Sequence, residues 1–153
     1  MKYFYLLACL IVLACGPGKT NSKEKEQLDL YLSEIYKVDL KEYPKSIAII
    51  VSGNCGSCTE KTIRFIKKID QDKRFDPYKK LLVIPVNNAS VKDSIGNGSS
   101  FRIIIDEHQN IDKYGINLPK NLFLECEKGD VVFQDWLYLE KIDTIAAKYG
   151  VAL

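Results

Sequence analysis

The hydrophobic positions of the chain alternate between helix-like repeats and short apolar runs. Residues 24–40 carry apolar side chains at the spacing i, i+3, i+4 and i+7, which predicts a helix with one buried face. The positions are Leu28, Tyr31, Leu32 and Ile35. Pro44 breaks this pattern, because proline disfavours helical backbone in the residue before it. The next run, SIAIIVS (46–52), is β-branched and non-alternating, which is typical of a strand buried on both faces in a parallel sheet.

A second helical pattern follows that strand after the short segment GNCGSC (53–58). In TEKTIRFIKKID (59–70), isoleucines recur at helical intervals. The rest of the chain predicts a strand (81–86), a polar loop with one helical turn (87–100), a strand (101–106), a short helix ending near Gly115, a hairpin turning at EKGD (127–130), and a helix (139–150). Parallel strand–helix units followed by a hairpin predict an α/β fold. Its central mixed β-sheet is flanked by helices, with a C-terminal β-hairpin and a final helix.

Length and charge limit the classes of function. A chain of 153 residues suits one domain with a substantial core. A formal net charge of +2 is too small to indicate a nucleic-acid partner, so we expect none.

The first fifteen residues differ from the rest of the chain. Lys2 precedes the apolar run YFYLLACLIVLA, which is shorter than the roughly 20 residues of a membrane-spanning helix and fits an export signal. Its end, VLAC, resembles the bacterial lipobox, which implies cleavage before Cys15 and lipidation of that cysteine. A plain signal peptide that contains cysteines is the alternative. We therefore expect a protein anchored by lipid in the bacterial cell envelope, facing the periplasm or the cell surface.

The segment after Cys15, GPGKTNSKEKEQ, is rich in Gly, Pro, Ser and charged residues. Such a composition cannot bury itself and is typical of a flexible tether. The predicted organisation is a signal peptide (1–15), a tether (16–27) and a folded domain (28–153).

Cys55 and Cys58 lie two residues apart where the predicted strand turns into a helix. They could be a metal clip, a structural staple or a pair that opens and closes. Zinc needs four ligands, and the mature chain adds only Cys126 and His108, without a second spacing motif. A disulfide that closes so short a loop stabilises little by chain entropy. In an exported protein disulfides persist, so a working pair is favoured and no metal or cofactor is expected.

The helix N-terminus suggests a division of roles within the pair. Unpaired N–H groups and the helix dipole favour a thiolate there. We assign Cys55, the first and more exposed cysteine, as the nucleophile and Cys58 as the resolving thiol. Cys126 lies in a predicted strand, where a buried inert thiol is the common outcome, although a redox role stays open. His108 is expected in a solvated loop.

Three segments carry a resemblance to a known family: SIAIIVSGNCGSCTEKTIRFIKK, the later YGINLPKNLFLECEKGDVVF, and the extra strand FRIIID ending at Asp106. Together they resemble thioredoxin-fold proteins, most of all the exported, membrane-tethered TlpA-like branch of thiol-disulfide oxidoreductases. The resemblance implies partner proteins with disulfides or thiols, and an electron donor at the membrane. It also implies that Pro119 is the cis-proline of the family and faces the cysteine pair. Asn54 and Leu118 would then contact the partner.

The chain departs from the family at four positions. Asn54 stands where Trp is usual, Ser57 where Pro is common, and Leu118 where a small β-branched residue is usual. Ile49 takes the place of the buried acid of cytoplasmic thioredoxins. These departures leave an alternative open, namely a non-catalytic thioredoxin-fold binding module or a copper or other metal carrier that uses the same cysteines. Copper carriers on this fold generally use Cys-x-x-x-Cys, which this chain lacks.

Overall fold

The computed structural model describes residues 22–52 and 56–153. Within these residues, one five-stranded sheet has the order β3-β2-β1-β4-β5. The strands are β1 (Lys45–Ile50), β2 (Lys79–Pro85), β3 (Arg102–Asp106), β4 (Asn121–Glu127) and β5 (Asp130–Leu137). β1, β2 and β3 run parallel, whereas β4 is antiparallel to β1 and β5 is antiparallel to β4. The carboxyl ends of the parallel strands therefore lie beside the beginning of β4. They share the edge of the sheet that runs across the strand ends, not along an outer strand.

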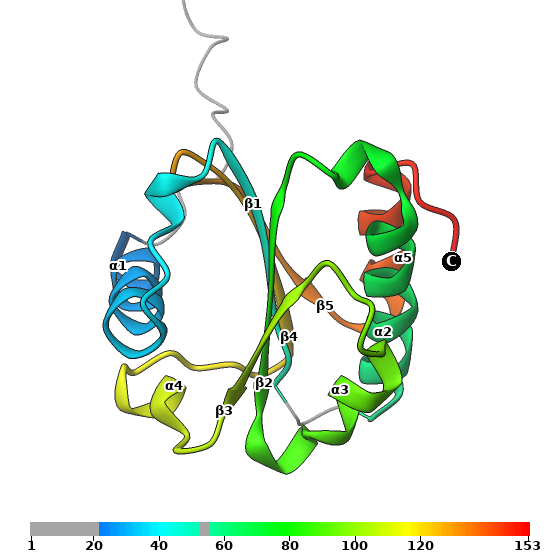
Figure 1. The fold of residues 1–153 in the computed structure, drawn as a ribbon. Helices are drawn as coiled ribbons and strands as arrows, with labels where there is room; N and C mark the ends of the chain where they lie inside the picture. Colours follow the sequence, from blue (N-terminus) through cyan, green and yellow to red (C-terminus); the bar gives the residue numbers. More distant parts are fainter. Residues whose placement is uncertain (1–21, 53–55) are drawn as a thin grey trace, which may run out of the picture.

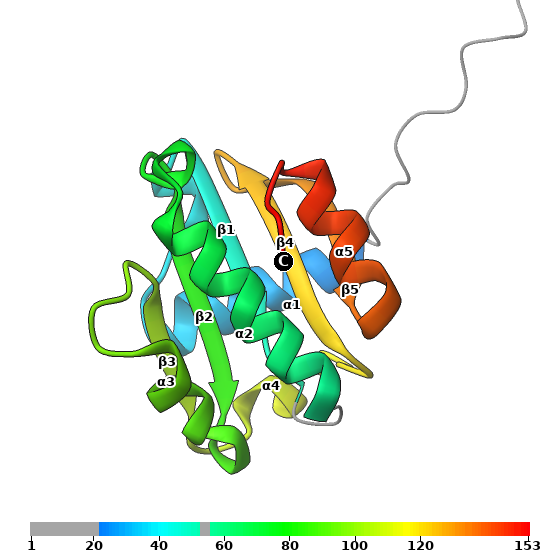
Figure 2. The same ribbon diagram turned by 90° about the vertical axis from the view of Figure 1, so that its right-hand side faces the viewer.

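Helices cover both faces of this sheet (Figure 1). The α-helices are α1 (Ser22–Leu30), α2 (Gly56–Gln71), α3 (Ser90–Ile95), α4 (Asn110–Lys113) and α5 (Leu139–Lys148). α1 and α4 lie on one face, and α2, α3 and α5 on the other, which Figure 2 views directly. The predicted α/β architecture, with a mixed sheet between helices, a C-terminal hairpin and a final helix, is confirmed. No helix in the described residues combines the length and apolar character that crossing a membrane requires.

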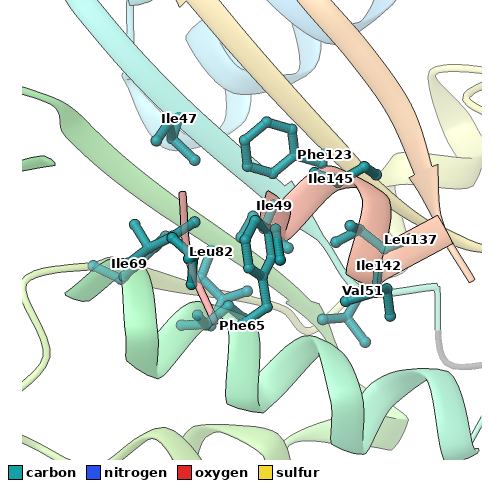
Figure 3. Close-up of a cluster of buried hydrophobic side chains, with 14 of the residues drawn as sticks. Ile47, Ile49, Val51, Phe65, Ile69, Leu82, Phe123, Leu137, Ile142 and Ile145 are labelled. Carbon is teal, nitrogen blue, oxygen red and sulfur yellow. The ribbon is translucent and has the colours of Figure 1, made fainter. Parts of the chain in front are cut away.

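Strand β1 is buried on both sides, as its non-alternating apolar run predicted. Ile47 and Ile49, with Val51 just beyond the strand, belong to the core under α2 and α5, whereas Ala48 and Ile50 belong to the core under α1 and α4. The side chains alternate between the two cores because successive residues of a strand point to opposite faces. The first core is drawn in Figure 3, where Phe65 of α2 lies close to Phe123 of β4. Their ring centroids are 5.7 Å apart.

The buried side of α2 follows a helical repeat that the sequence indicated only in part. The buried residues of α2 are Cys58, Thr62, Phe65, Ile66 and Ile69. Their spacing of i, i+4, i+7, i+8 and i+11 is one helix face, so Cys58 and Thr62 lie one turn apart on the same side. Full burial of a side chain such as Phe65 stabilises the fold by about 1.5–3 kcal/mol. Packing of this face therefore holds α2 against the sheet, including the first turn, which carries Cys58.

The N-terminal helix differs from its prediction over 24–40. α1 continues into a π-helical segment, Tyr31–Ile35, and the helical backbone ends at Tyr36. A π-helical turn takes in one extra residue, which shifts every later side chain around the axis. As a result Ile35 is 37% exposed, and Tyr36 packs against the core in its place.

The predicted tether boundary at residue 27 is also wrong. Residues 22–27 are helical, because α1 begins at Ser22. Lys25 on this stretch forms an ion pair with Asp130 of the hairpin, at 2.7 Å between Nζ and Oδ1. Leu28 in the following turn is buried in the core under α1. The folded domain therefore begins earlier than composition alone suggested.

The remaining elements agree with the sequence. The predicted helical turn inside the polar loop is α3, and α4 ends at Lys113, shortly before Gly115, whose φ of +69° suits glycine. The hairpin turns at Gly129, with φ of +82°, where an added Cβ would lie 2.5 Å from the Lys41 side chain. Final helix α5 buries Ile142, Ile145 and Ala146, as its spacing predicted.

Candidate functional site

The candidate site lies where β1 gives way to α2. Ser52 follows the strand, α2 begins at Gly56, and Cys58 is its third residue. Cys58 is disulfide-bonded and 3% exposed. Its bonding partner lies outside the described residues, because Cys126 is free. The predicted nucleophile Cys55, its neighbour Asn54 and the predicted lipid site Cys15 also lie outside them.

The position of Cys58 in α2 has a chemical consequence. The first N–H groups of a helix have no partner within the helix, and the dipole of this 16-residue helix adds positive potential at that end. Such an environment stabilises a thiolate relative to a thiol. Cys58 therefore lies where the end of the helix favours a thiolate, whereas its burial opposes one.

Asn121, which sequence reasoning missed, ties this region together. It is the first residue of β4 and is fully buried. Its Oδ1 accepts a hydrogen bond from the Ser52 N–H at 2.9 Å, and its Nδ2 donates to Thr62 Oγ1 at 3.0 Å. Since Thr62 lies one turn from Cys58, the side chain of Asn121 connects the end of β1 to the first turns of α2. A single amide thus fixes the spacing of the two elements on either side of residues 53–55.

The signal for Asn121 was present in the sequence. The strand NLFLEC begins with one amide in an otherwise apolar stretch. Buried amides need hydrogen-bond partners, so a polar residue on a central strand indicates a specific contact. The partners, Ser52 and Thr62, lie 69 and 59 residues away, and only the folded structure identifies them.

A polar cavity of about 220 Å³ opens at the same edge of the sheet. Its residues come from the ends of the three parallel strands, from α4 and from the segment before β4. They are Ile50, Val51, Ser52, Val83, Pro85, Asn87, Asp106, Gln109, Ile111, Asp112, Asn117 and Leu118. Ligands of open α/β sheets characteristically bind at this edge. Leu118, which the resemblance gave as a partner-binding residue, is therefore part of the lining of a cavity.

Asp106 is the buried charge of this cavity. Its Oδ1 accepts hydrogen bonds from the Tyr36 hydroxyl and from the backbone and side-chain N–H groups of Asn110, at 2.9–3.1 Å, and its Oδ2 accepts one from the Ile111 N–H at 2.9 Å. Burial alone would raise the pKa of Asp106, but these hydrogen bonds outweigh it and hold the pKa below its ordinary value. Asp106 therefore stays ionised and anchors the first turn of α4.

The prediction of a cis peptide bond before Pro119 is wrong. Among the described residues no peptide bond is cis. Pro119 is exposed and lies two residues before β4, where its missing N–H costs no bond of the sheet. The trans form of an X–Pro bond is favoured by about 0.5–1 kcal/mol, and Leu118 packs against the core under α1 with the bond trans. The catalytic role inferred for Pro119 rested on the cis bond and is not carried forward.

Cys126 and His108 lie apart from Cys58. Cys126 is fully buried in the core under α1, five residues along β4 from Asn121 and thus about 17 Å away. Burial raises the pKa of Cys126 to about 11, and the prediction that this thiol is buried is confirmed, whereas its low reactivity stays a prediction. His108 is exposed in the turn after β3, as predicted. Within residues 22–52 and 56–153, His, Cys, Asp and Glu form no cluster of three that could hold a metal ion.

Comparison with known proteins assigns the chain to no family, so its class is described from its own geometry. No protein-family model, curated protein or solved structure matches it. The described residues define an α/β protein with a five-stranded mixed sheet between helices. A disulfide-bonded cysteine lies in the first turn of the helix that follows its central parallel strand.

Proposed function

We propose that the chain is a thiol-disulfide oxidoreductase with a thioredoxin-like fold. In this proposal it acts in the bacterial cell envelope and is held at a membrane by lipid on Cys15. The observation that carries the proposal is the disulfide of Cys58, in the first turn of α2 and directly after parallel strand β1. Cys55 is the proposed bonding partner of Cys58, since it is the cysteine nearest in sequence.

The proposed reaction transfers two electrons to a partner protein. The Cys55 thiolate attacks one sulfur of the partner's disulfide, which forms a mixed disulfide and releases the partner's first thiolate. The Cys58 thiolate then attacks the Cys55 sulfur, which closes the Cys55–Cys58 disulfide and releases the second thiolate. Both released thiolates take up protons. A dithiol donor at the membrane must reduce Cys55 and Cys58 again before the next turnover.

Two observations favour this reaction over the alternatives. A disulfide between Cys55 and Cys58 would close a loop of four residues, for which the chain-entropy model gives about 2 kcal/mol, against nearly 5 for a loop of about 100 residues. A structural staple there would be a weak one. A metal carrier would need further ligands near Cys58, and in the part of the chain that the structure describes no such cluster surrounds it. The first turn of a helix, by contrast, activates a thiol for exchange.

Trapping experiments test the proposal. The Cys58→Ser variant should accumulate mixed disulfides with partner proteins through Cys55, because the resolving thiol is gone. Cys55→Ser should accumulate few, and Cys126→Ser is the matched control that removes a thiol far from the pair. The wild-type chain should also catalyse the reduction of insulin by dithiothreitol. If Cys58→Ser captures no more partner than Cys55→Ser does, the proposed roles of the two thiols are refuted.

The proposed lipid anchor has a separate test. Mass spectrometry of the mature protein should find an N-terminal Cys15 carrying lipid, and Cys15→Ala should leave the chain unprocessed or release it from the membrane fraction. An unmodified chain cut at another residue would contradict the anchor without bearing on the reaction.

A further inference from the structure

The polar cavity, defined by the twelve lining residues above, carries negative charge that its own lining does not neutralise. Its described lining includes two carboxylates, Asp106 and Asp112, and no Lys, Arg or His. Asp106 is 1% exposed, so its charge acts through a medium of low dielectric constant, where it is felt strongly. Asp112 of α4 also lines the cavity and is exposed to solvent, so a group from outside can reach it. The cavity therefore attracts a cation.

The neutral residues of the lining suit a cation at the end of an apolar stem. Asn87, Gln109 and Asn117 supply amide oxygens, which accept hydrogen bonds from an ammonium or guanidinium group. Ile50 and Leu118 supply apolar surface against which methylene groups can pack. A volume of about 220 Å³ is large enough to admit one long side chain. Lysine and arginine combine these features.

The place of the cavity indicates where that side chain comes from. Ser52 lines the cavity on one face of the sheet, and its N–H is held by Asn121, which also bonds Thr62 of α2. Thr62 lies one helical turn from the disulfide-bonded Cys58. A group bound in the cavity therefore lies on the same edge of the sheet as the first turn of α2.

We propose that the polar cavity receives a lysine or arginine side chain of the polypeptide whose disulfide the chain exchanges. The choice of that partner rests on the proposed oxidoreductase function, whereas the preference for a basic side chain rests on the lining alone. The cavity is thus a specificity site: partners with a basic residue near their disulfide are preferred over partners with a neutral or acidic one.

A binding measurement tests the cavity without any turnover. The probes are short, otherwise uncharged peptides that carry one lysine, one norleucine or one glutamate at the same position. Amide NMR spectra of the oxidised full chain should shift at Asn87, Gln109 and Asn117 on adding the lysine peptide. The norleucine peptide, which keeps most of the stem but lacks the charge, should bind more weakly, and the glutamate peptide should not bind.

Variants of Asp112 separate the charge from the shape. Asp112→Asn should weaken the lysine peptide about two- to fivefold, as expected for a partly exposed charge pair, and Asp112→Lys should abolish its binding. Glu42→Gln removes an exposed carboxylate near the start of β1 and should change nothing. Asp106 is left intact, because its hydrogen bonds hold the start of α4. Equal binding of the lysine and norleucine peptides, or unchanged binding by Asp112→Lys, would overturn the inference.

A rate measurement then links the cavity to the reaction. Two disulfide peptides that differ only in lysine or norleucine beside the cystine should differ about two- to fivefold in kcat/KM with the wild-type chain and hardly at all with Asp112→Asn. A chain that binds the lysine peptide but reduces neither peptide would refute the oxidoreductase proposal and leave the basic-side-chain site standing. A chain that reduces both peptides at the same rate would refute the specificity role alone.

Discussion

Cys58 and Cys126 occupy opposite ends of the sheet, and although both are buried, they differ in the element that carries them and in their bonding state. Cys58 lies in the first turn of a long helix, is disulfide-bonded, and lies one turn from the Asn121–Thr62 hydrogen bond. Cys126 lies inside β4 in a sealed apolar core, where burial raises its pKa to about 11. The comparison teaches that two buried cysteines of one sheet can differ in bonding state according to the element on which they lie.

The two ends also differ in how their polar groups are used. At the end of the sheet where Cys58 lies, the buried polar groups of Asn121 and Asp106 are joined to neighbouring elements by hydrogen bonds, and a cavity opens there. Near Cys126, the described neighbours are mainly apolar side chains of the core under α1. Hydrogen-bonded polar networks of this kind fix the geometry of a site, although burying their polar groups costs free energy. Apolar packing stabilises the fold without specifying a site.

The largest difference in activity should appear when Cys58 and Cys126 are each replaced by serine, in separate variants. Cys58→Ser should reduce the insulin-reduction rate to that of a chain lacking both Cys55 and Cys58, because the mixed disulfide can no longer be resolved from within. Cys126→Ser should keep the wild-type rate. A Cys126→Ser variant as inactive as Cys58→Ser would remove the contrast between the two cysteines.

Alkylation should show the next largest difference. With the disulfide reduced, iodoacetamide should modify Cys126 at least about a hundredfold more slowly in the folded chain than in the unfolded chain, because burial suppresses both the thiolate and access to it.

The raised pKa of Cys126 also predicts that the folded chain loses stability at high pH. The unfolded thiol loses its proton near its ordinary pKa of about 8.5, and the folded thiol only near 11, so the free energy of unfolding should fall as the pH rises between these values.

Cys126→Ala removes the titrating group and is the control for the alkaline experiment. Its free energy of unfolding should lack the part of the pH dependence above about pH 8.5 that belongs to this thiol. Rapid alkylation of Cys126 in the folded chain, at a rate close to that of the unfolded chain, would show that the core under α1 is not sealed.

Asn121→Leu should destabilise the site end of the sheet. The variant leaves the Ser52 N–H and the Thr62 hydroxyl without their amide partner in a buried place, which costs about 1–3 kcal/mol. Urea unfolding measures the loss, and Asn97→Leu, in an exposed loop, is the matched control with an expected change within about 0.5 kcal/mol. The reduction potential of the Cys58 disulfide should shift as well, since Asn121 helps to hold the first turns of α2. An unchanged potential would limit Asn121 to a structural role.

The smallest effect concerns acid stability. The pKa of Asp106 is lower in the folded chain than its ordinary value near 3.9, so the unfolded chain binds more protons in acid. The stability that Asp106 supplies is therefore complete above about pH 4 to 5 and is lost as the pH falls through the folded-state pKa. Asp106→Asn should unfold more easily at neutral pH and show a shallower loss between about pH 5 and pH 3. Circular dichroism should follow the acid unfolding of both chains in parallel. An equal loss of stability per pH unit in the two chains would contradict this prediction.

The sequence predicted the elements of the fold well because each depends on local periodicity. The apolar run of β1 and the isoleucine repeat of α2 identify a central strand and an amphipathic helix without reference to any other residue. The π-helical segment escaped prediction, because the extra residue at Tyr31–Ile35 is stabilised by packing of Tyr36 and by its hydrogen bond to Asp106, 70 residues away. The tether boundary failed for the same reason, since Lys25 finds its partner in the distant hairpin.

The candidate site was predictable only where a motif announces it. Cys58 was found from its spacing and its position before a helix, whereas Asn121 and the polar cavity depend on contacts between β1, α2, α4 and β4. The error at Pro119 has a different origin. It came from carrying a conformation over from a resemblance, although the residues around this proline do not impose it.

The central claim is that the disulfide of Cys58 opens and closes while the chain stays folded. Equilibration of the full chain in glutathione buffers of graded potential, with Cys126 replaced by serine and thiols counted by mass spectrometry, measures this directly. The account predicts reversible gain and loss of two thiols per chain with unchanged circular dichroism, at a potential within the range in which catalytic pairs operate, about −120 to −270 mV. A disulfide that resists reduction until the chain unfolds would contradict the account and identify the bond of Cys58 as a structural staple.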